Sequence, residues 1–105
     1  MGLTLVEVNT KDFDKLFKET DEAFYINEFG KGGEETRYNN CIEYLLTGQE
    51  MTPSTVVVRE TDDKVEIGFI DGRHRYSVLR DMKIEKIPVA MSKDSIEIAK
   101  KYNLI

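Results

Sequence analysis

The sequence has 105 residues with 20 acidic and 15 basic side chains, a formal net charge of −5 at pH 7, and one cysteine, Cys41. This length predicts a single domain over residues 1–105 that can bury a core without disulfides or metals. The negative balance argues against non-specific duplex binding, which depends on Lys and Arg side chains. No apolar run reaches the roughly 18 residues that cross a bilayer, and the start does not resemble a secretory signal. We therefore expect a cytoplasmic protein with no membrane partner.

Hydrophobic spacing in the first half of the chain predicts one strand and two helices. Asn9 or Thr10 can cap the first helix, and Gly48 stands just past the end of the second. Three glycines within residues 30–33 indicate a flexible loop between the helices. In chain order, the predicted elements are a strand 3–8, a helix 11–19, a short apolar stretch 23–27, a loop 28–35 and a helix 36–47.

The second half predicts a hairpin followed by helices around one more strand. Two β-rich runs follow the break at Pro53, and the turn 61–64 joins them. The second run leads through Asp71-Gly72 directly into a helix. This combination of predicted strands and helices indicates an α/β or α+β fold, with a small mixed sheet and packed helices. The predicted elements are strands 54–59 and 65–70, a helix 73–82, a strand 86–91 and a helix 95–102 with Asp94 and Glu97 as its capping pair.

Apolar side chains that recur at helical spacing are expected in the core. Cys41 is expected to be a small buried side chain, whereas Arg80 and Lys83 are expected to be solvated. The predicted core residues are Phe13, Leu16 and Phe17 in the first helix, Tyr38, Ile42, Leu45 and Leu46 in the second, and Tyr76, Val78, Leu79 and Met82 in the third.

The sharpest chemical signal is the turn Asp71-Gly72-Arg73-His74-Arg75, between a predicted strand and a predicted helix. The first amides of a helix lack partners and attract an anion. Gly72 lets the backbone approach a ligand, and the two arginines suit phosphate oxygens. His74, the single histidine, can donate to phosphate or move a proton. Asp71 could hold magnesium, orient His74 or cap the helix.

The structural alternative for this turn is an ordinary Asp-Gly turn with a solvated helix start. The sequence has no Walker loop and no dinucleotide-binding fingerprint. One histidine and one cysteine far apart in sequence do not define a zinc site.

Segment 67–82, together with Ile87-Pro88-Val89, resembles the ParB/sulfiredoxin superfamily, whose members pass from a strand through a Gly-x-His-Arg turn into a helix and then to Ile-Pro-Val. The resemblance covers about residues 44–102. It implies a ParB/sulfiredoxin-like fold whose turn binds the phosphates of a nucleoside di- or triphosphate, with Mg²⁺ as a further cofactor. Sulfiredoxins have a catalytic cysteine where this chain has Arg73, so their activity is not implied. Small kinases with Asp-Gly-His-His-Arg are the most similar subgroup.

The kinase resemblance implies phosphoryl transfer or nucleotide hydrolysis. His74 and Asp71 would take part, and a loop acid would deprotonate the acceptor. Glu28 is the preferred base, ahead of Glu34 and Glu35, although all three acids could simply be solvated. The resemblance implies a phosphate-binding set of Gly72, Arg73, His74 and Arg75, to which Arg37 could be added unless it pairs with Glu34 or Glu35.

A non-catalytic binding module is the alternative function. The same pocket could bind a nucleic-acid phosphate, although the excess of acidic side chains makes this partner weakly supported. The segment 12–35, with eight acidic and three basic residues, could instead dock on a basic protein. A phage- or plasmid-encoded regulator would suit such a domain, and a homo-oligomer is open as well. DNA cleavage is least favoured, because the sequence has no clear carboxylate cluster for metals.

Overall fold

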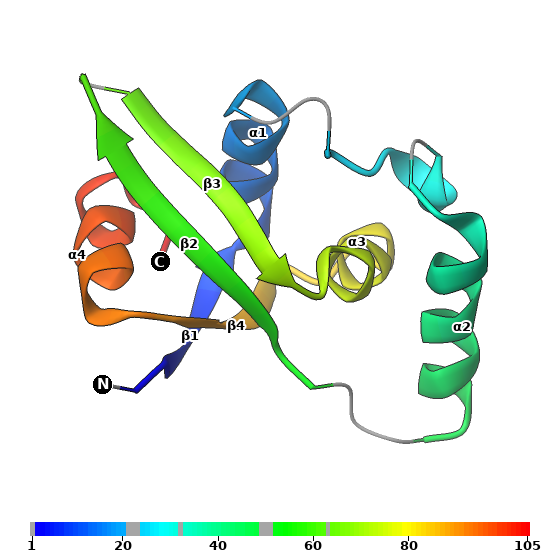
Figure 1. Ribbon diagram of the computed structural model, residues 1–105. Coiled ribbons are helices and arrows are strands. Elements are labelled where there is room, and N and C mark those ends of the chain that lie inside the picture. Colours follow the sequence, from blue (N-terminus) through cyan, green and yellow to red (C-terminus); the bar gives the residue numbers. More distant parts are fainter. Residues whose placement is uncertain (1, 21–23, 32, 49–51, 63) are drawn as a thin grey trace.

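The computed structural model describes residues 2–20, 24–31, 33–48, 52–62 and 64–105. These residues form strands, helices and one short 3-10 turn, η1 (Figure 1). In chain order the elements are β1 (Thr4–Asn9), α1 (Thr10–Thr20), η1 (Glu28–Gly30), α2 (Glu35–Leu46), β2 (Ser54–Thr61), β3 (Lys64–Asp71), α3 (Arg73–Asp81), β4 (Lys86–Met91) and α4 (Lys93–Lys101).

The strands form one mixed sheet in the order β1-β4-β2-β3. The outer pairs β1–β4 and β2–β3 are antiparallel, whereas β2 runs parallel to β4 over two residue pairs at the start of β2. Further along β2, α4 supplies the missing partner for the backbone. The Ser95 hydroxyl accepts from the Val58 amide at 3.1 Å and donates to the Val58 carbonyl at 3.3 Å. The helix α3 connects β3 to β4.

One face of the sheet carries the hydrophobic core. Strand side chains alternate between the two faces, so Leu5 and Ile70 on the opposite face are 59% and 70% exposed. The helices α1, α3 and α4 all contribute to a single buried cluster with the strands. The Tyr76 ring of α3 lies 5.3 Å from the Phe13 ring of α1 and 5.1 Å from the Phe69 ring of β3, measured between centroids. These contacts fix α3 against the end of the hairpin.

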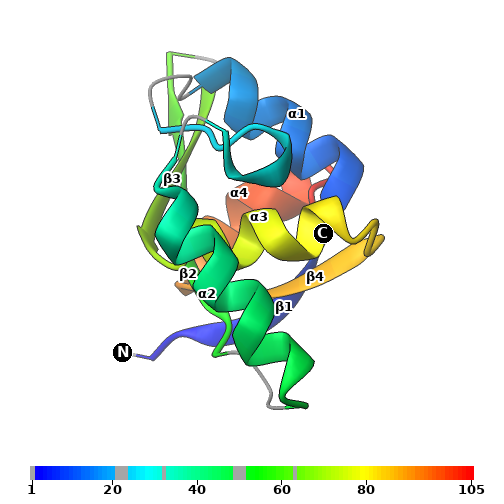
Figure 2. The same ribbon diagram turned by 90° about the vertical axis from the view of Figure 1, so that its right-hand side faces the viewer.

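The helix α2 lies outside this cluster. It packs against α3 and η1 rather than against the sheet, and Figure 2 shows it in front of α3, on the outside of the molecule. Because α2 packs on α3, the segment just before α2 lies against the start of α3. The candidate functional site is found there.

The expected α+β fold with a small mixed sheet and packed helices is confirmed, and the predicted helix and strand boundaries agree with the structure to within two residues. Two details differ. The loop 28–35 contains η1, and α4 is capped by the Ser92 side chain, which accepts from the Ser95 amide, instead of by Asp94 and Glu97. Position 23 of the apolar stretch, position 32 of the loop and position 63 of the turn lie outside the described residues. No helix in the described part is long and apolar enough to cross a membrane.

Several predicted environments are wrong, because helical spacing does not show which side chains another element covers. Leu46 is 81% exposed and Met82 is 57% exposed, because both lie at helix ends beyond the reach of the sheet. Cys41 of α2 is only partly buried. In contrast, the Arg80 side chain is 9% exposed instead of solvated, while Lys83 is exposed as expected.

Candidate functional site

The turn that joins β3 to α3 leaves several backbone donors free. Gly72 occupies the N-cap position in the left-handed region (φ 84°, ψ 23°), and no side chain caps the helix. The first backbone hydrogen bond of the helix runs from the Tyr76 amide to the Gly72 carbonyl at 3.0 Å. The amides of Arg73, His74 and Arg75 therefore have no acceptor within the described part of the chain. They form the donor set that a helix start offers to an anion.

Gly72 is required at this position by both conformation and space. Its positive φ favours glycine, and a Cβ added there would lie 2.6 Å from the Ser54 hydroxyl oxygen and 2.7 Å from Arg75 Nη2. The Ser54 hydroxyl donates to the Gly72 carbonyl at 2.7 Å. Ser54 and Arg75 thus hold the turn from one side.

Arg75 folds back over the turn that precedes it. Its Nη1 donates to the Thr52 carbonyl at 2.8 Å, and its Nη2 donates to the Asp71 carboxylate at 2.7 Å. Asp71, which the sequence suggested might orient His74 or hold magnesium, is instead paired with Arg75. The observed contacts make Arg75 a positioning residue for the Asp71-Gly72 turn.

The side chains of Arg73 and His74 project from α3 in directions different from that of Arg75. Arg73 Nη1 donates to the Phe24 carbonyl at 2.6 Å, and its guanidinium lies 5.7 Å from the centre of the Phe24 ring. His74 is 8% exposed, and its Nε2 accepts from the Glu34 amide at 3.1 Å. Successive residues of a helix project about 100° apart, so Arg73, His74 and Arg75 reach three separate segments. These contacts do not form the expected clamp of three side chains around one phosphate.

The contact of His74 joins the start of α2 to the start of α3. Gly33 packs closely on the imidazole, since a Cβ added to Gly33 would lie 3.2 Å from His74 Nε2. Arg37 pairs with Glu34 at 2.9 Å, between two exposed side chains. Burial lowers the pKa of His74, and the positive charges of Arg73 and Arg37 lower this pKa further. Two helix starts and two arginines therefore surround a neutral imidazole.

This environment predicts a pH dependence that depends on His74. Its pKa in the folded chain lies below the unfolded value of 6.5, so protonation favours the unfolded chain. The stability that the neutral imidazole contributes is present above pH 6.5 and is lost as the pH falls through the folded-state pKa. Urea midpoints measured between about pH 5.5 and 7.5, above the usual carboxyl range, should therefore fall with decreasing pH. His74→Gln can still accept from the Glu34 amide but gains no proton, so this decline should disappear. An unchanged decline in the variant would contradict the assignment.

Glu28, the preferred catalytic base, does not lie at this turn. Its neighbour Phe29 donates its amide to the Asp81 carboxylate at 3.0 Å. Asp81 ends α3, about 12 Å from Arg73 by the 1.5 Å rise of a helix. Among the three acids of the predicted loop, Glu34 is the one whose backbone contacts His74. Across the described ranges, no three His, Cys, Asp or Glu side chains gather in a way that could hold a metal ion.

A buried polar network at the far end of α3 was missed by the sequence reasoning; we call it the Arg80 network. Arg80 lies between two carboxylates, with Nη1 3.3 Å from Asp14 Oδ1 and Nη2 3.0 Å from Asp81 Oδ1. Three tyrosine hydroxyls complete it: Tyr25 and Tyr76 donate to Asp14, and Tyr38 donates to Asp81. Burial, followed by the contacts with these carboxylates, raises the pKa of Tyr25 and of Tyr38 to about 12. No local pattern signals the network, because Asp14 and Arg80 are far apart in sequence.

Two cavities adjoin the start of α3. One of about 360 Å³ is next to Arg73 and has aromatic walls formed by Phe17, Phe24 and Phe69. The other, of about 240 Å³, lies beside Arg75 and includes Tyr44 and Cys41 of α2. Burial raises the pKa of the Cys41 thiol, which disfavours the reactive thiolate.

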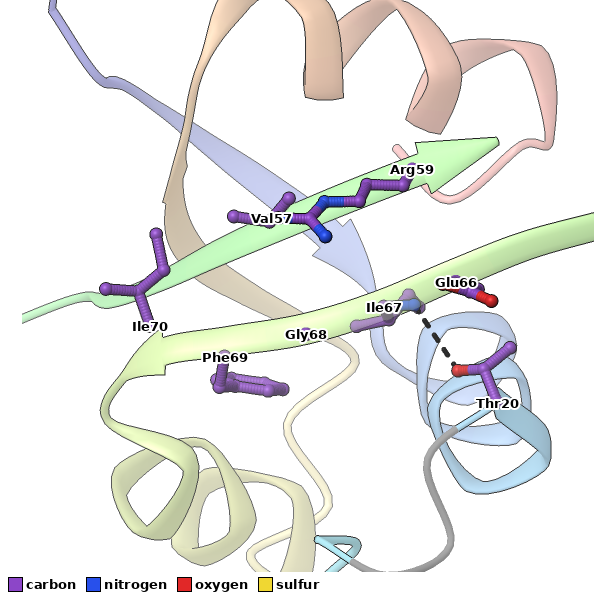
Figure 3. Close-up of a pocket in the computed structure, with 8 residues that line it drawn as sticks. All are labelled: Thr20, Val57, Arg59, Glu66, Ile67, Gly68, Phe69 and Ile70. Atoms are coloured by element: carbon purple, nitrogen blue, oxygen red, sulfur yellow. Dashed lines mark hydrogen bonds between the residues drawn. The ribbon is translucent and has the colours of Figure 1, made fainter. Parts of the chain in front are cut away.

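A further cavity of about 280 Å³ lies along the β2–β3 hairpin (Figure 3). At its edge the Ile67 amide donates to the Thr20 hydroxyl at 3.3 Å. Its charged residues, Arg59 and Glu66, are cross-strand partners of opposite sign, and no predicted site residue lines it. We therefore do not assign the functional site to this cavity.

Comparisons with known protein families and with curated proteins find no match. Among solved structures, the chain is similar to the crystal structure of the Oncogenic Suppression Activity Protein, a plasmid fertility inhibition factor, in a gold(I) cyanide derivative. The TM-score is 0.79 at 14% sequence identity, and the match covers 96% of this chain and 56% of that chain. The likeness establishes the fold, and the chain spans a little over half the length of this neighbour.

Proposed function

We propose that this chain is a nucleotide-binding domain of the ParB/sulfiredoxin type, which binds the phosphates of a nucleoside di- or triphosphate at the start of α3. The observation that carries the proposal is the set of three amides, of Arg73, His74 and Arg75, that lack an acceptor in the described part of the chain. Helix-start amides after a left-handed glycine are a common phosphate-binding arrangement. The sequence resemblance of the turn supports the same ligand.

The side chains around the turn divide between binding and positioning. Arg73 forms no ion pair within the described residues and is the cation available to a phosphate. Arg37 is instead paired with Glu34, as the sequence allowed, and leaves the proposed phosphate-binding set. Arg75 and Ser54 hold Gly72 in place. His74 connects the start of α2 to α3 by accepting from the Glu34 amide, and its lowered pKa favours the neutral imidazole that can accept this hydrogen bond. Gly33 packs against the same imidazole. This assignment moves His74 from the phosphate ligands to the positioning residues.

The aromatic cavity beside Arg73 is the place for the base of the nucleotide. Its volume, about 360 Å³, is in the range of small-molecule sites, and aromatic walls favour stacking of a nucleobase. Mg²⁺ would arrive with the phosphates, whose oxygens usually supply several of its ligands.

Two forms of the function follow. In the catalytic form, Glu34 replaces Glu28 as the candidate base for phosphoryl transfer or hydrolysis, because its backbone lies at the site beside His74. Its carboxylate, which is paired with Arg37 at 2.9 Å, would have to leave that ion pair to reach an acceptor. In the non-catalytic form, the domain is a regulator, and the observation that favours this form is the fold likeness to a plasmid fertility inhibition factor. Nucleotide turnover that Glu34→Gln abolishes would select the catalytic form, and binding without turnover would select the regulator.

Calorimetric titration with ATP, ADP, CTP and GTP, each with and without Mg²⁺, tests the binding. We expect at least one nucleotide to bind, and Arg73→Gln to weaken it about tenfold or more, since a charge-assisted hydrogen bond contributes about 1.5–3 kcal/mol. Arg59→Gln is the matched control, because Arg59 is exposed on β2 and lines neither cavity at the start of α3. Absence of binding for all four nucleotides, or equal affinity in Arg73→Gln, would refute the proposed site.

A further inference from the structure

A further cavity, with a mainly cationic lining, lies at the opposite end of α3 from the turn. It has a volume of about 470 Å³ and lies between α1 and the segment that leads from α3 to β4. In Figure 2 the beginning of α1 lies beside the end of α3 and this segment. Its lining residues are Thr10, Lys11, Asp14 and Lys15 of α1, Arg80 of α3, and Lys83, Ile84 and Glu85 after α3.

Three lysines at this cavity outnumber the acids that face them. Lys11 and Lys15 are one helical turn apart on the same face of α1, and Lys83 faces the cavity from the other wall. None of them forms an ion pair within the described part of the chain. Of the two acids in the lining, Asp14 already accepts hydrogen bonds from Tyr25, Tyr76 and Arg80, which leaves Glu85 as the single acid opposing three lysines.

Two residues that line this cavity each carry a buried side-chain donor without a hydrogen-bond acceptor. The Thr10 hydroxyl and Arg80 Nη2 are the buried side-chain polar atoms without a hydrogen-bond partner among the described residues. Thr10 is 8% exposed, and the Arg80 side chain is 9% exposed. Arg80 Nη2 lies 3.0 Å from Asp81 Oδ1, so the carboxylate neutralises the guanidinium charge, but this contact lacks hydrogen-bond geometry.

The chemistry of these two atoms identifies the missing partner. A guanidinium nitrogen can only donate, and a hydroxyl can donate, so the partner that both lack is an acceptor. The first turn of α1 adds its positive dipole end to the lysine charges. A cation is therefore disfavoured at this position, and an anion with several oxygens is favoured.

We propose that this cavity is a second anion site, which binds a phosphate group with Lys11, Lys15 and Lys83 around it and the Thr10 hydroxyl and Arg80 at its inner wall. The site is independent of the proposed nucleotide pocket, since the two lie at opposite ends of α3. The phosphate could belong to a small molecule or to a nucleic-acid backbone, which present the same oxygens to the lysines.

Amide NMR spectra of the full chain test the proposal, with inorganic phosphate, pyrophosphate and a short oligothymidylate added separately at constant ionic strength. We expect saturable shifts of the Thr10, Lys11 and Lys83 amides. Saturation by phosphate or pyrophosphate would assign a small-molecule ligand, and saturation by the oligothymidylate alone would assign a nucleic-acid backbone. The amides of Arg73 and Arg75 report separately on the nucleotide pocket, so failure at one site is distinguishable from failure at the other.

Two variants make the test specific. Lys11→Ala combined with Lys83→Ala removes exposed charges and should weaken binding about tenfold or more, whereas Lys64→Ala combined with Lys100→Ala, exposed lysines elsewhere, should leave it unchanged. Thr10→Val removes the unpaired hydroxyl at nearly constant volume and should weaken phosphate binding while the chain stays folded. Absence of saturable shifts with every probe, or equal binding in the Lys11/Lys83 variant, would overturn the proposal.

Discussion

Replacing Arg80 with Met is expected to lower the free energy of unfolding by about 3–5 kcal/mol, because it leaves the nearly buried carboxylate of Asp81 and the partly buried carboxylate of Asp14 without their counter-charge. Arg80 contacts Asp14 and Asp81, and the side chains of Arg80 and Asp81 are each 9% exposed. Met keeps most of the length of the side chain, so the loss reflects charge and hydrogen bonds more than packing. Urea-induced unfolding, followed by circular dichroism, measures this change.

The control for this prediction is an exposed ion pair of the same kind. Lys101 lies 2.9 Å from Glu60, with the lysine side chain 63% exposed. Lys101→Met should leave the urea midpoint almost unchanged, as is usual for surface pairs. If Arg80→Met cost no more than Lys101→Met, the Arg80 network would not be the support for α3 that its geometry indicates.

Gly72→Ala is expected to have the second large effect, on stability and on binding together. At φ 84° an alanine is strained, and its Cβ would meet Ser54 and Arg75 at less than 3 Å. Left-handed strain and overpacking together should cost about 2–4 kcal/mol. Because the turn must shift to relieve this clash, nucleotide affinity should fall at least tenfold in calorimetry.

Gly48 provides a matched comparison. It has φ 80°, close to that of Gly72, but an added Cβ would meet no atom within 4 Å. Gly48→Ala should therefore lose only the conformational part, about 1–2 kcal/mol, and keep its nucleotide affinity. Equal costs for the two variants would show that the packing around Gly72 is unimportant.

The fold was largely predictable because its signals are local. Alternating strands and the breaks at Pro53 and Gly72 fix the order and type of the elements to within two residues. Leu46 and Met82 are exposed although the sequence predicts them in the core, because helical spacing shows which face is apolar but not whether another element covers it. Arg80 was misjudged because Asp14, which neutralises it, comes from α1.

The site was predictable in its backbone and less so in its side chains. The free amides after Gly72 follow directly from a strand that passes into a helix through glycine. The divergence of Arg73, His74 and Arg75 could also have been foreseen, because adjacent helical residues do not face one ligand. The position of Glu28 could not have been foreseen from the sequence. Its neighbour Phe29 contacts Asp81 at the far end of α3, whereas Glu34 contacts His74 near the start of α3, and no local pattern predicts this course.

The backbone amide signals of Arg73, His74 and Arg75, followed while each of the four nucleotides is added to the full chain, test the central claim most directly. For at least one nucleotide we expect these three amide signals to move together and reach saturation, and we expect Gly72→Ala to remove the response. Nucleotide-induced shifts confined to other parts of the chain, with these three amides unmoved, would contradict it.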